Sequence, residues 1–86
     1  MTTITVIGKP GCHLCPAALE VVETVVADLP DAIGDEIEIV EQSIETDAEL
    51  YALWWEKIPV VLIDGEFHAQ WRVSPERLRA RLTGGV

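Results

Sequence analysis

Two cysteines separated by two residues stand between a short apolar run and a long one, and this arrangement constrains the fold more than any other feature. Cys12 and Cys15 are the only cysteines in the 86 residues. The run before them is short and rich in β-branched residues, whereas the run after them has helical spacing. In the first turn of a helix, residues three apart lie about 5–6 Å from each other. A disulfide tolerates Cα separations of roughly 4.4–6.8 Å, so we expect this pair to open and close with little movement of the backbone.

Size and composition limit the class of protein. A chain of 86 residues predicts a single domain over residues 1–86, and such a domain buries about 60–65% of its unfolded surface. An apolar fraction of 49% supports a folded core. No apolar run approaches the roughly 18 residues that a membrane span needs, and no positive charge precedes the first apolar run. We therefore expect a cytoplasmic protein, in a compartment where a disulfide is usually transient.

Charge is spread unevenly along the chain. The net charge is −9, with twelve acidic side chains and one lysine in residues 1–56 and an excess of two positive charges in residues 57–86. Binding of nucleic acid needs clustered lysine and arginine. The sequence therefore predicts neither nucleic acid nor a membrane as a partner, and we interpret the acidic side chains as a solvated surface.

Periodicity and turn signals predict the element order βαβαββα. The expected strands are residues 3–7, 36–41, 58–63 and 66–71, and the expected helices are residues 12–29, 47–54 and 75–83, the last ended by Gly84 and Gly85. Asp64-Gly65 predicts a two-residue hairpin. Ser74 followed by Pro75 predicts the start of the last helix.

This order predicts the topology of the sheet. A helix joins the first two strands, which should therefore be parallel, and the hairpin adds an antiparallel pair. Three glutamates suit the second strand to an edge of the sheet. Helices on both faces of a four-stranded mixed sheet give an α/β domain with the thioredoxin fold.

The cysteine pair is the candidate for chemistry. The reactive form in disulfide exchange is the thiolate, and a helix N-terminus stabilises negative charge through its free amides and its dipole. We expect Cys12 to be the nucleophile, with Lys9 nearby, and Cys15 to be the less exposed resolving thiol one turn further in. His13 either tunes the Cys12 thiolate or is simply exposed.

Two other uses of the cysteines compete with redox chemistry. Both thiols could be small buried hydrophobic groups, or they could form a zinc site with His13 and His68, although zinc needs four well-placed ligands. The spacing and the position before a helix favour redox chemistry, so we expect no metal at this site.

The chain resembles the glutaredoxin family, in particular the short bacterial glutaredoxin-like proteins. The resemblance covers nearly the whole chain and is carried by Lys9-Pro10-Gly11-Cys12-His13-Leu14-Cys15, Ile58-Pro59-Val60 and Asp64-Gly65. It implies a dithiol thiol–disulfide oxidoreductase with a redox-active Cys12 and Cys15 and no bound cofactor. It also implies that Pro59 is a cis-proline facing the cysteines and that the Ile58 backbone pairs with substrate. The expected substrate-binding residues are Lys9, His13, Ile58 and Pro59.

The resemblance also indicates partners. It implies that protein or small-molecule disulfides are the substrates, that glutathione or a thioredoxin-type reductase supplies electrons, and that the protein is a monomer. Typical glutaredoxins hold a glutathione carboxylate with a glycine-rich segment that has no match at residues 72–75.

Two alternatives to this interpretation stay open. One is a non-catalytic binding module that bridges an iron–sulfur cluster through Cys12, and the other is a regulatory redox pair without turnover. Of the adjacent Trp54 and Trp55, one must face away from the core, where a contact with substrate at the rim is a further hypothesis.

Overall fold

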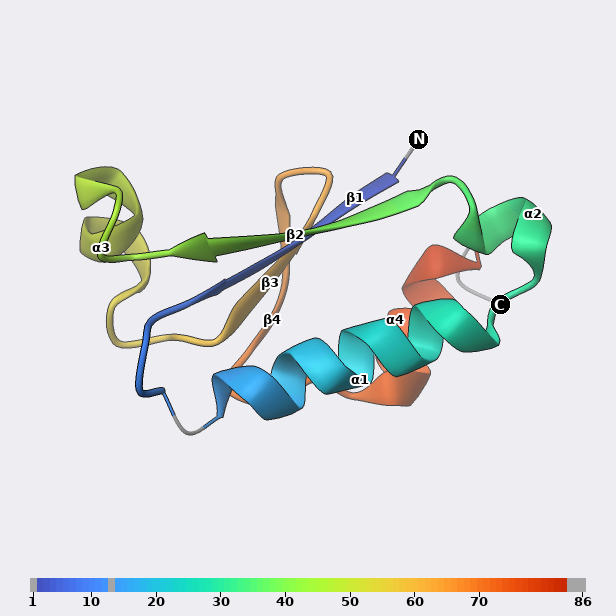
Figure 1. Cartoon of the computed structure of the whole chain (residues 1–86), viewed down its shortest axis with the longest axis horizontal. Coiled ribbons are helices and arrows are strands. Elements are labelled where there is room, and N and C mark those ends of the chain that lie inside the picture. The colour runs from blue at the N-terminus through green and yellow to red at the C-terminus, as the bar shows by residue number, and fades with distance from the viewer. Residues whose placement is uncertain (1, 13, 84–86) are drawn as a thin grey trace.

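Four strands form one mixed sheet in the order β2-β1-β3-β4 in the computed structural model, which describes residues 2–12 and 14–83 (Figure 1). The strands are β1 (Thr2–Gly8), β2 (Ile37–Ser43), β3 (Val60–Ile63) and β4 (Glu66–Gln70), and the helices are α1 (Cys15–Asp28), α2 (Asp31–Gly34), α3 (Ala48–Trp54) and α4 (Pro75–Leu82). β1 is parallel to β2 and antiparallel to β3, which pairs antiparallel with β4. The expected thioredoxin-like architecture and the edge position of the second strand are confirmed.

Different helices cover the two faces of the sheet. Successive residues of a strand point to opposite faces, so Ile4 and Val6 join the larger core cluster with buried residues of α1 and α4. Ile7 lies in a smaller cluster with Ile44 and Val60, against which α3 packs. Figure 1 shows α3 at one end of the molecule and α2 at the other. The prediction of helices on both faces is confirmed.

Side-chain caps explain where two helices begin. The Asp47 carboxylate accepts hydrogen bonds from the backbone N–H groups of Glu49 (2.8 Å) and Leu50 (3.3 Å) at the start of α3. The Ser74 hydroxyl accepts one from the N–H of Arg77 (3.3 Å) at the start of α4. Such caps satisfy amides that a helix leaves free at its N-terminus, so these two starts follow from local sequence.

The hairpin between β3 and β4 turns at the predicted dipeptide. Asp64 has φ 51° and Gly65 has φ 83°, as a type I′ turn requires. The Asp64 carboxylate accepts a hydrogen bond from the N–H of Thr3 (2.9 Å), and the Asp64 N–H donates to the Thr3 carbonyl (2.8 Å). The turn is therefore fastened to β1.

The start of α1 differs from the prediction. We expected the helix to begin at Cys12, but it begins at Cys15, with Leu14 as N-cap. Pro16 has no N–H, so the Cys12 carbonyl cannot receive the hydrogen bond that would extend the helix backwards. The first bond runs from the Ala18 N–H to the Leu14 carbonyl (3.1 Å). Cys12 lies in the preceding loop, and Leu14 is 43% exposed.

The helices are short, and one of them was not predicted. In residues 2–12 and 14–83, no helix has the length and apolar character to cross a bilayer. α2 has four residues with Pro30 as N-cap, where the sequence indicated only the end of a helix. α4 ends at Leu82, and the predicted stop at Gly84 and Gly85 lies outside the described residues.

Candidate functional site

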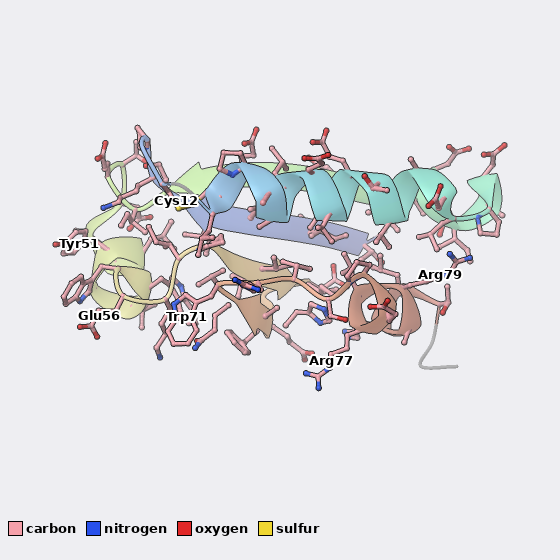
Figure 2. All side chains as sticks on the ribbon, turned by 90° about the horizontal axis from the view of Figure 1, so that it is seen from below. Cys12, Tyr51, Glu56, Trp71, Arg77 and Arg79 are labelled. Atoms are coloured by element: carbon pink, nitrogen blue, oxygen red, sulfur yellow. A yellow bond between two sulfur atoms is a disulfide. The ribbon has the colours of Figure 1, made fainter. Side chains whose placement is uncertain are left out.

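Cys12 and Cys15 form a disulfide between the end of β1 and the start of α1 (Figure 2). Their Cα atoms are 5.5 Å apart, near the usual separation for a bridge. The predicted proximity is confirmed, although the helix does not include Cys12. Both residues are half-buried.

A tight turn leads from β1 to Cys12. Gly11 has φ 81°, a left-handed conformation that glycine adopts without steric cost. The Cys12 N–H donates to the Lys9 carbonyl (3.2 Å), which closes the turn. Lys9 is exposed on this turn. The turn therefore holds Cys12 ahead of α1, with one cationic side chain close in sequence.

The N-terminus of α1 has free amides and no competing anion. Leu14 makes no side-chain cap, and the first turn contains no acidic residue. α3 and α4 differ, since Asp47 and Ser74 cap them. Because free amides and the helix dipole favour negative charge, the electrostatics of this end favour an anionic sulfur at Cys12.

Gly8 leaves the space that the Cys15 sulfur occupies. A Cβ added to Gly8 would lie 2.6 Å from the Cys15 Sγ and 3.1 Å from its Cβ. Gly8 is buried at the end of β1, and its carbonyl accepts a hydrogen bond from the N–H of Ile44 (2.9 Å). The sequence indicated only a strand end at Gly8, because no local pattern reveals which side chain crosses over a glycine.

The Ile58–Pro59 peptide is cis, as the resemblance implied. β1 and β3 pair Ile7 with Val60, and the same register continued by one residue places Pro59 opposite Gly8. Pro59 is fully buried. It therefore lies beside the strand end on which the Cys15 sulfur rests, while its contact with substrate stays a prediction.

An open groove of about 530 Å³ adjoins the disulfide. Both cysteines line it, together with Lys9 from the turn, Leu19 from α1 and Glu41 from β2. Apolar surface and charges of both signs thus meet beside the sulfur atoms. The disulfide therefore forms part of the wall of this groove.

The other predicted site residues do not all lie beside the disulfide. Ile58 and Pro59 do not line this groove, and Ile58 packs instead against the smaller cluster beneath α3. The structure therefore brings Lys9 to the cysteines and places Ile58 on the other side of the sheet. His13 lies outside the described residues.

His68 lies on β4 and lines another cavity, with Arg77. Burial lowers the pKa of His68 from its ordinary value of 6.5, and the charges of Arg81 and Arg77 lower it further. In the part of the chain that the structure describes, no group of three or more histidine, cysteine, aspartate or glutamate side chains could hold a metal ion. His68 is thus a partly buried neutral histidine among arginines.

Comparison with known proteins gives consistent results. The family model described as Glutaredoxin-like domain (DUF836) matches residues 3–83. The uncharacterized proteins Rv0508 of Mycobacterium tuberculosis and Mb0520 of Mycobacterium bovis are each 28% identical over 80 residues, which is 90% of this chain and 78% of theirs. The X-ray structure of XcR50, a Northeast Structural Genomics target protein from X. campestris, superimposes with a TM-score of 0.70. It is 23% identical and covers 94% of this chain and 96% of that one, a likeness that concerns the fold.

Proposed function

The chain belongs to the glutaredoxin-like domain family, and on that premise we propose that it is a small dithiol thiol–disulfide oxidoreductase. The observation that carries the proposal is the cysteine pair itself. Cys12 and Cys15 are bridged, with Cα atoms 5.5 Å apart, at the start of a helix that has no side-chain cap. An open groove beside them gives a substrate access.

The first step uses Cys12. In the reduced protein its thiolate attacks one sulfur of a substrate disulfide, and a mixed disulfide forms while the other substrate sulfur leaves as a thiolate and takes a proton from water. Cys12 has this role because it lies in the loop, ahead of the free amides of α1, where negative charge is stabilised.

The second step uses Cys15. Its sulfur, deprotonated as it reacts, attacks the Cys12 sulfur and displaces the second substrate thiolate, which takes up the second proton. Two electrons have then passed to the substrate, and the Cys12–Cys15 disulfide is restored. Gly8 lets the Cys15 sulfur lie close to β1 within reach of Cys12.

A reductant must reopen the disulfide after each cycle. Two glutathione thiols or the dithiol of a thioredoxin-type reductase supply the required electron pair, and no bound cofactor is needed. We assign substrate contacts to Lys9, His13, the backbone of Ile58 and Pro59, with protein or small-molecule disulfides as substrates. The proposal further includes a monomer that acts in the cytoplasm.

A coupled reduction assay tests this function. Bis(2-hydroxyethyl) disulfide is offered with glutathione and glutathione reductase in one arm, and with thioredoxin reductase in the other. The wild-type protein should accelerate reduction in at least one arm, and Cys12→Ser should abolish the acceleration. No activity in either arm, or full activity of Cys12→Ser, would overturn the assignment. A visible absorption band of anaerobically purified protein would favour cluster binding instead.

A further inference from the structure

All the aromatic residues of the chain lie outside the buried core. The sequence holds three tryptophans, one tyrosine and one phenylalanine, and we define the aromatic surface as these five residues, Tyr51, Trp54, Trp55, Phe67 and Trp71. Tyr51 and Trp55 are each 51% exposed, Trp71 is 52% exposed and Phe67 is 53% exposed, whereas Trp54 is half-buried. The expectation that one of Trp54 and Trp55 faces outward is confirmed. Large exposed apolar patches of this kind usually mark interaction sites.

The rings of the aromatic surface are ordered against one another. Tyr51 and Trp55 stack with ring centroids 6.2 Å apart, and Trp54 and Phe67 stack at 6.1 Å. These contacts join α3 to β4, which are remote in sequence. Exposed rings that are already fixed in place lose little conformational freedom when a partner binds, so the entropic cost of binding at this surface is low.

Trp71 connects the aromatic surface to the proposed redox site. Its φ of 63° is unfavourable for a bulky residue. Two hydrogen bonds hold it there, from its N–H to the Pro59 carbonyl (2.8 Å) and from its indole Nε1 to the Glu56 carbonyl (3.1 Å). Figure 2 shows Trp71, Tyr51 and Cys12 at the same end of the molecule. A polypeptide on these rings would therefore lie at the same end of the molecule as Cys12.

The border of the aromatic surface carries charges of both signs. Glu45, Glu49 and Glu56 are exposed on α3 and its flanking segments. The ammonium group of Lys57 lies 5.7 Å from the centroid of the Trp54 ring, which is a cation–aromatic contact. On the side of β4, Arg72 and Arg77 line a cavity with Phe67. The stacked pair Tyr51 and Trp55 is flanked in sequence by the exposed carboxylates of Glu49 and Glu56. This pair therefore suits a ligand that is both apolar and positively charged.

We propose that the Tyr51–Trp55 pair of the aromatic surface docks an arginine-bearing segment of a partner polypeptide and so presents the partner's disulfide to Cys12. A guanidinium group can lie flat on a tryptophan or tyrosine ring while it pairs with a carboxylate. The same carboxylates repel an anionic lipid surface. The inference rests on the proposed function for the role of the disulfide, and it names the substrate class as protein disulfides with cationic flanks.

A binding test without redox chemistry uses two peptides that lack cysteine. In one, arginines alternate with leucines, and in the other, glutamates replace the arginines. Isothermal titration calorimetry of the oxidised protein at low salt should detect binding of the arginine peptide only, and added salt should weaken it because exposed charges are screened. Binding of neither peptide, or equal binding of both, would overturn the proposal.

Variants locate the binding on the molecule. Tyr51→Ser combined with Trp55→Ala should weaken binding by about two- to fivefold for each ring that no longer meets a guanidinium group. The matched control is Glu23→Gln combined with Glu36→Gln, which removes exposed charges away from α3. The control should bind like the wild type, and far-ultraviolet circular dichroism verifies the fold of every variant. An equally weakened control would show that only net charge matters and would overturn the proposal.

Turnover separates failure of the docking from failure of the function. Each peptide is given one cysteine in disulfide linkage to 2-mercaptoethanol. The wild type should reduce the arginine form with the lower KM, and the Tyr51→Ser, Trp55→Ala protein should lose this preference through KM while kcat is kept. Equal KM values for both forms would overturn the docking alone. No reduction of either peptide or of bis(2-hydroxyethyl) disulfide would overturn the function, and calorimetry would still decide the docking.

Experiments on the same proteins would detect two other occupants of the aromatic surface. Light scattering that shows a dimer, absent in the Tyr51→Ser, Trp55→Ala protein, would assign the surface to a second copy. Sedimentation of the protein with phosphatidylcholine vesicles, absent in the same variant, would assign it to a lipid surface. Either result would overturn the assignment to a cationic polypeptide.

Discussion

At Gly8 the absence of a side chain decides where the sulfur of Cys15 lies. A Cβ there would approach that sulfur to 2.6 Å, so Gly8→Ala should displace it. We expect a loss of about 1–3 kcal/mol in the free energy of unfolding, as for other overpacked sites, and slower disulfide reduction. Urea unfolding and the coupled assay measure the two effects.

Gly65→Ala is the control for this substitution. Gly65 has φ 83° and nothing within 4 Å of an added Cβ, so the change strains the backbone far from the cysteines. It should lower stability and leave the reduction rate unchanged. If Gly8→Ala kept both wild-type stability and wild-type rate, the close approach to Cys15 would have no functional importance.

The proposed nucleophile should have an acidic thiol. In the reduced protein we expect Cys12 to lose its proton well below about 8.5, the ordinary pKa of a free cysteine, because the amides at the start of α1 have no side-chain cap. Thiolate absorbance during a pH titration of Cys15→Ser measures this pKa. The Cys12→Ser protein reports Cys15 alone and should titrate higher. The reverse order would exchange the two roles.

His68 makes stability depend on pH in a defined direction. Burial, Arg81 and Arg77 lower its pKa in the folded protein, so the unfolded chain binds a proton first as the pH falls. Above the unfolded pKa of about 6.5, His68 is neutral in both states and does not reduce the stability of the folded protein. The free energy of unfolding then decreases as the pH falls through that value toward the lower folded pKa. Urea unfolding of the oxidised protein between about pH 7.5 and 5.5 should show this loss, and His68→Gln should flatten it. An unchanged slope in His68→Gln would contradict the assignment.

Among the helices, α1 combines an uncapped start with the proposed nucleophile, and a new charge can test the connection. Leu14 is the N-cap and is 43% exposed. Leu14→Asp places a carboxylate beside the same amides, which should raise the Cys12 pKa because a like charge disfavours the thiolate. Leu14→Asn is the uncharged match, and Leu53→Asp adds an equal charge at a 61% exposed position on α3. A rise in all three variants would exclude a local effect.

Elements whose boundaries depend on nearby side chains were predictable from sequence. Asp47 and Ser74 cap the helices that follow them, and Asp64 with Gly65 forms the expected turn. The start of α1 was misplaced because it depends on a missing donor at Pro16, whose effect falls on a carbonyl further back in the chain. The boundaries of an element can therefore be predicted from sequence where a side chain caps a helix or forms a turn within its own segment.

The candidate site was predictable only in part for the same reason. Spacing alone brought Cys12 and Cys15 together, and the resemblance supplied the cis-proline at Pro59. The contact between Gly8 and Cys15 depends on how α1 crosses the sheet, which no local pattern encodes. The aromatic surface likewise joins α3 to β4 through ring stacking, so it became visible only in three dimensions.

For the whole molecule, the disulfide closes a very small loop, with a sequence separation of 3. In the chain-entropy model, a loop of this size stabilises the folded state by about 2 kcal/mol, near the lower end for disulfides. We expect the reduced protein to stay folded and to be less stable by no more than about that amount. Urea unfolding with and without dithiothreitol measures the difference, and the Cys12→Ser, Cys15→Ser protein is the control for the reductant. Unfolding on reduction would mean that the bridge is structural.

The placement of the aromatic rings determines what light-based probes can report on this protein. Most indole groups of the folded chain already meet water, since Trp55 and Trp71 are about half exposed. Their emission should therefore be red-shifted even in the native state, and it will change little when the aliphatic interior melts. Quenching by iodide or a shift of the emission maximum will instead report whether a partner covers these rings, so intrinsic fluorescence measures binding at this surface. Amide hydrogen exchange is the better measure of unfolding of the core.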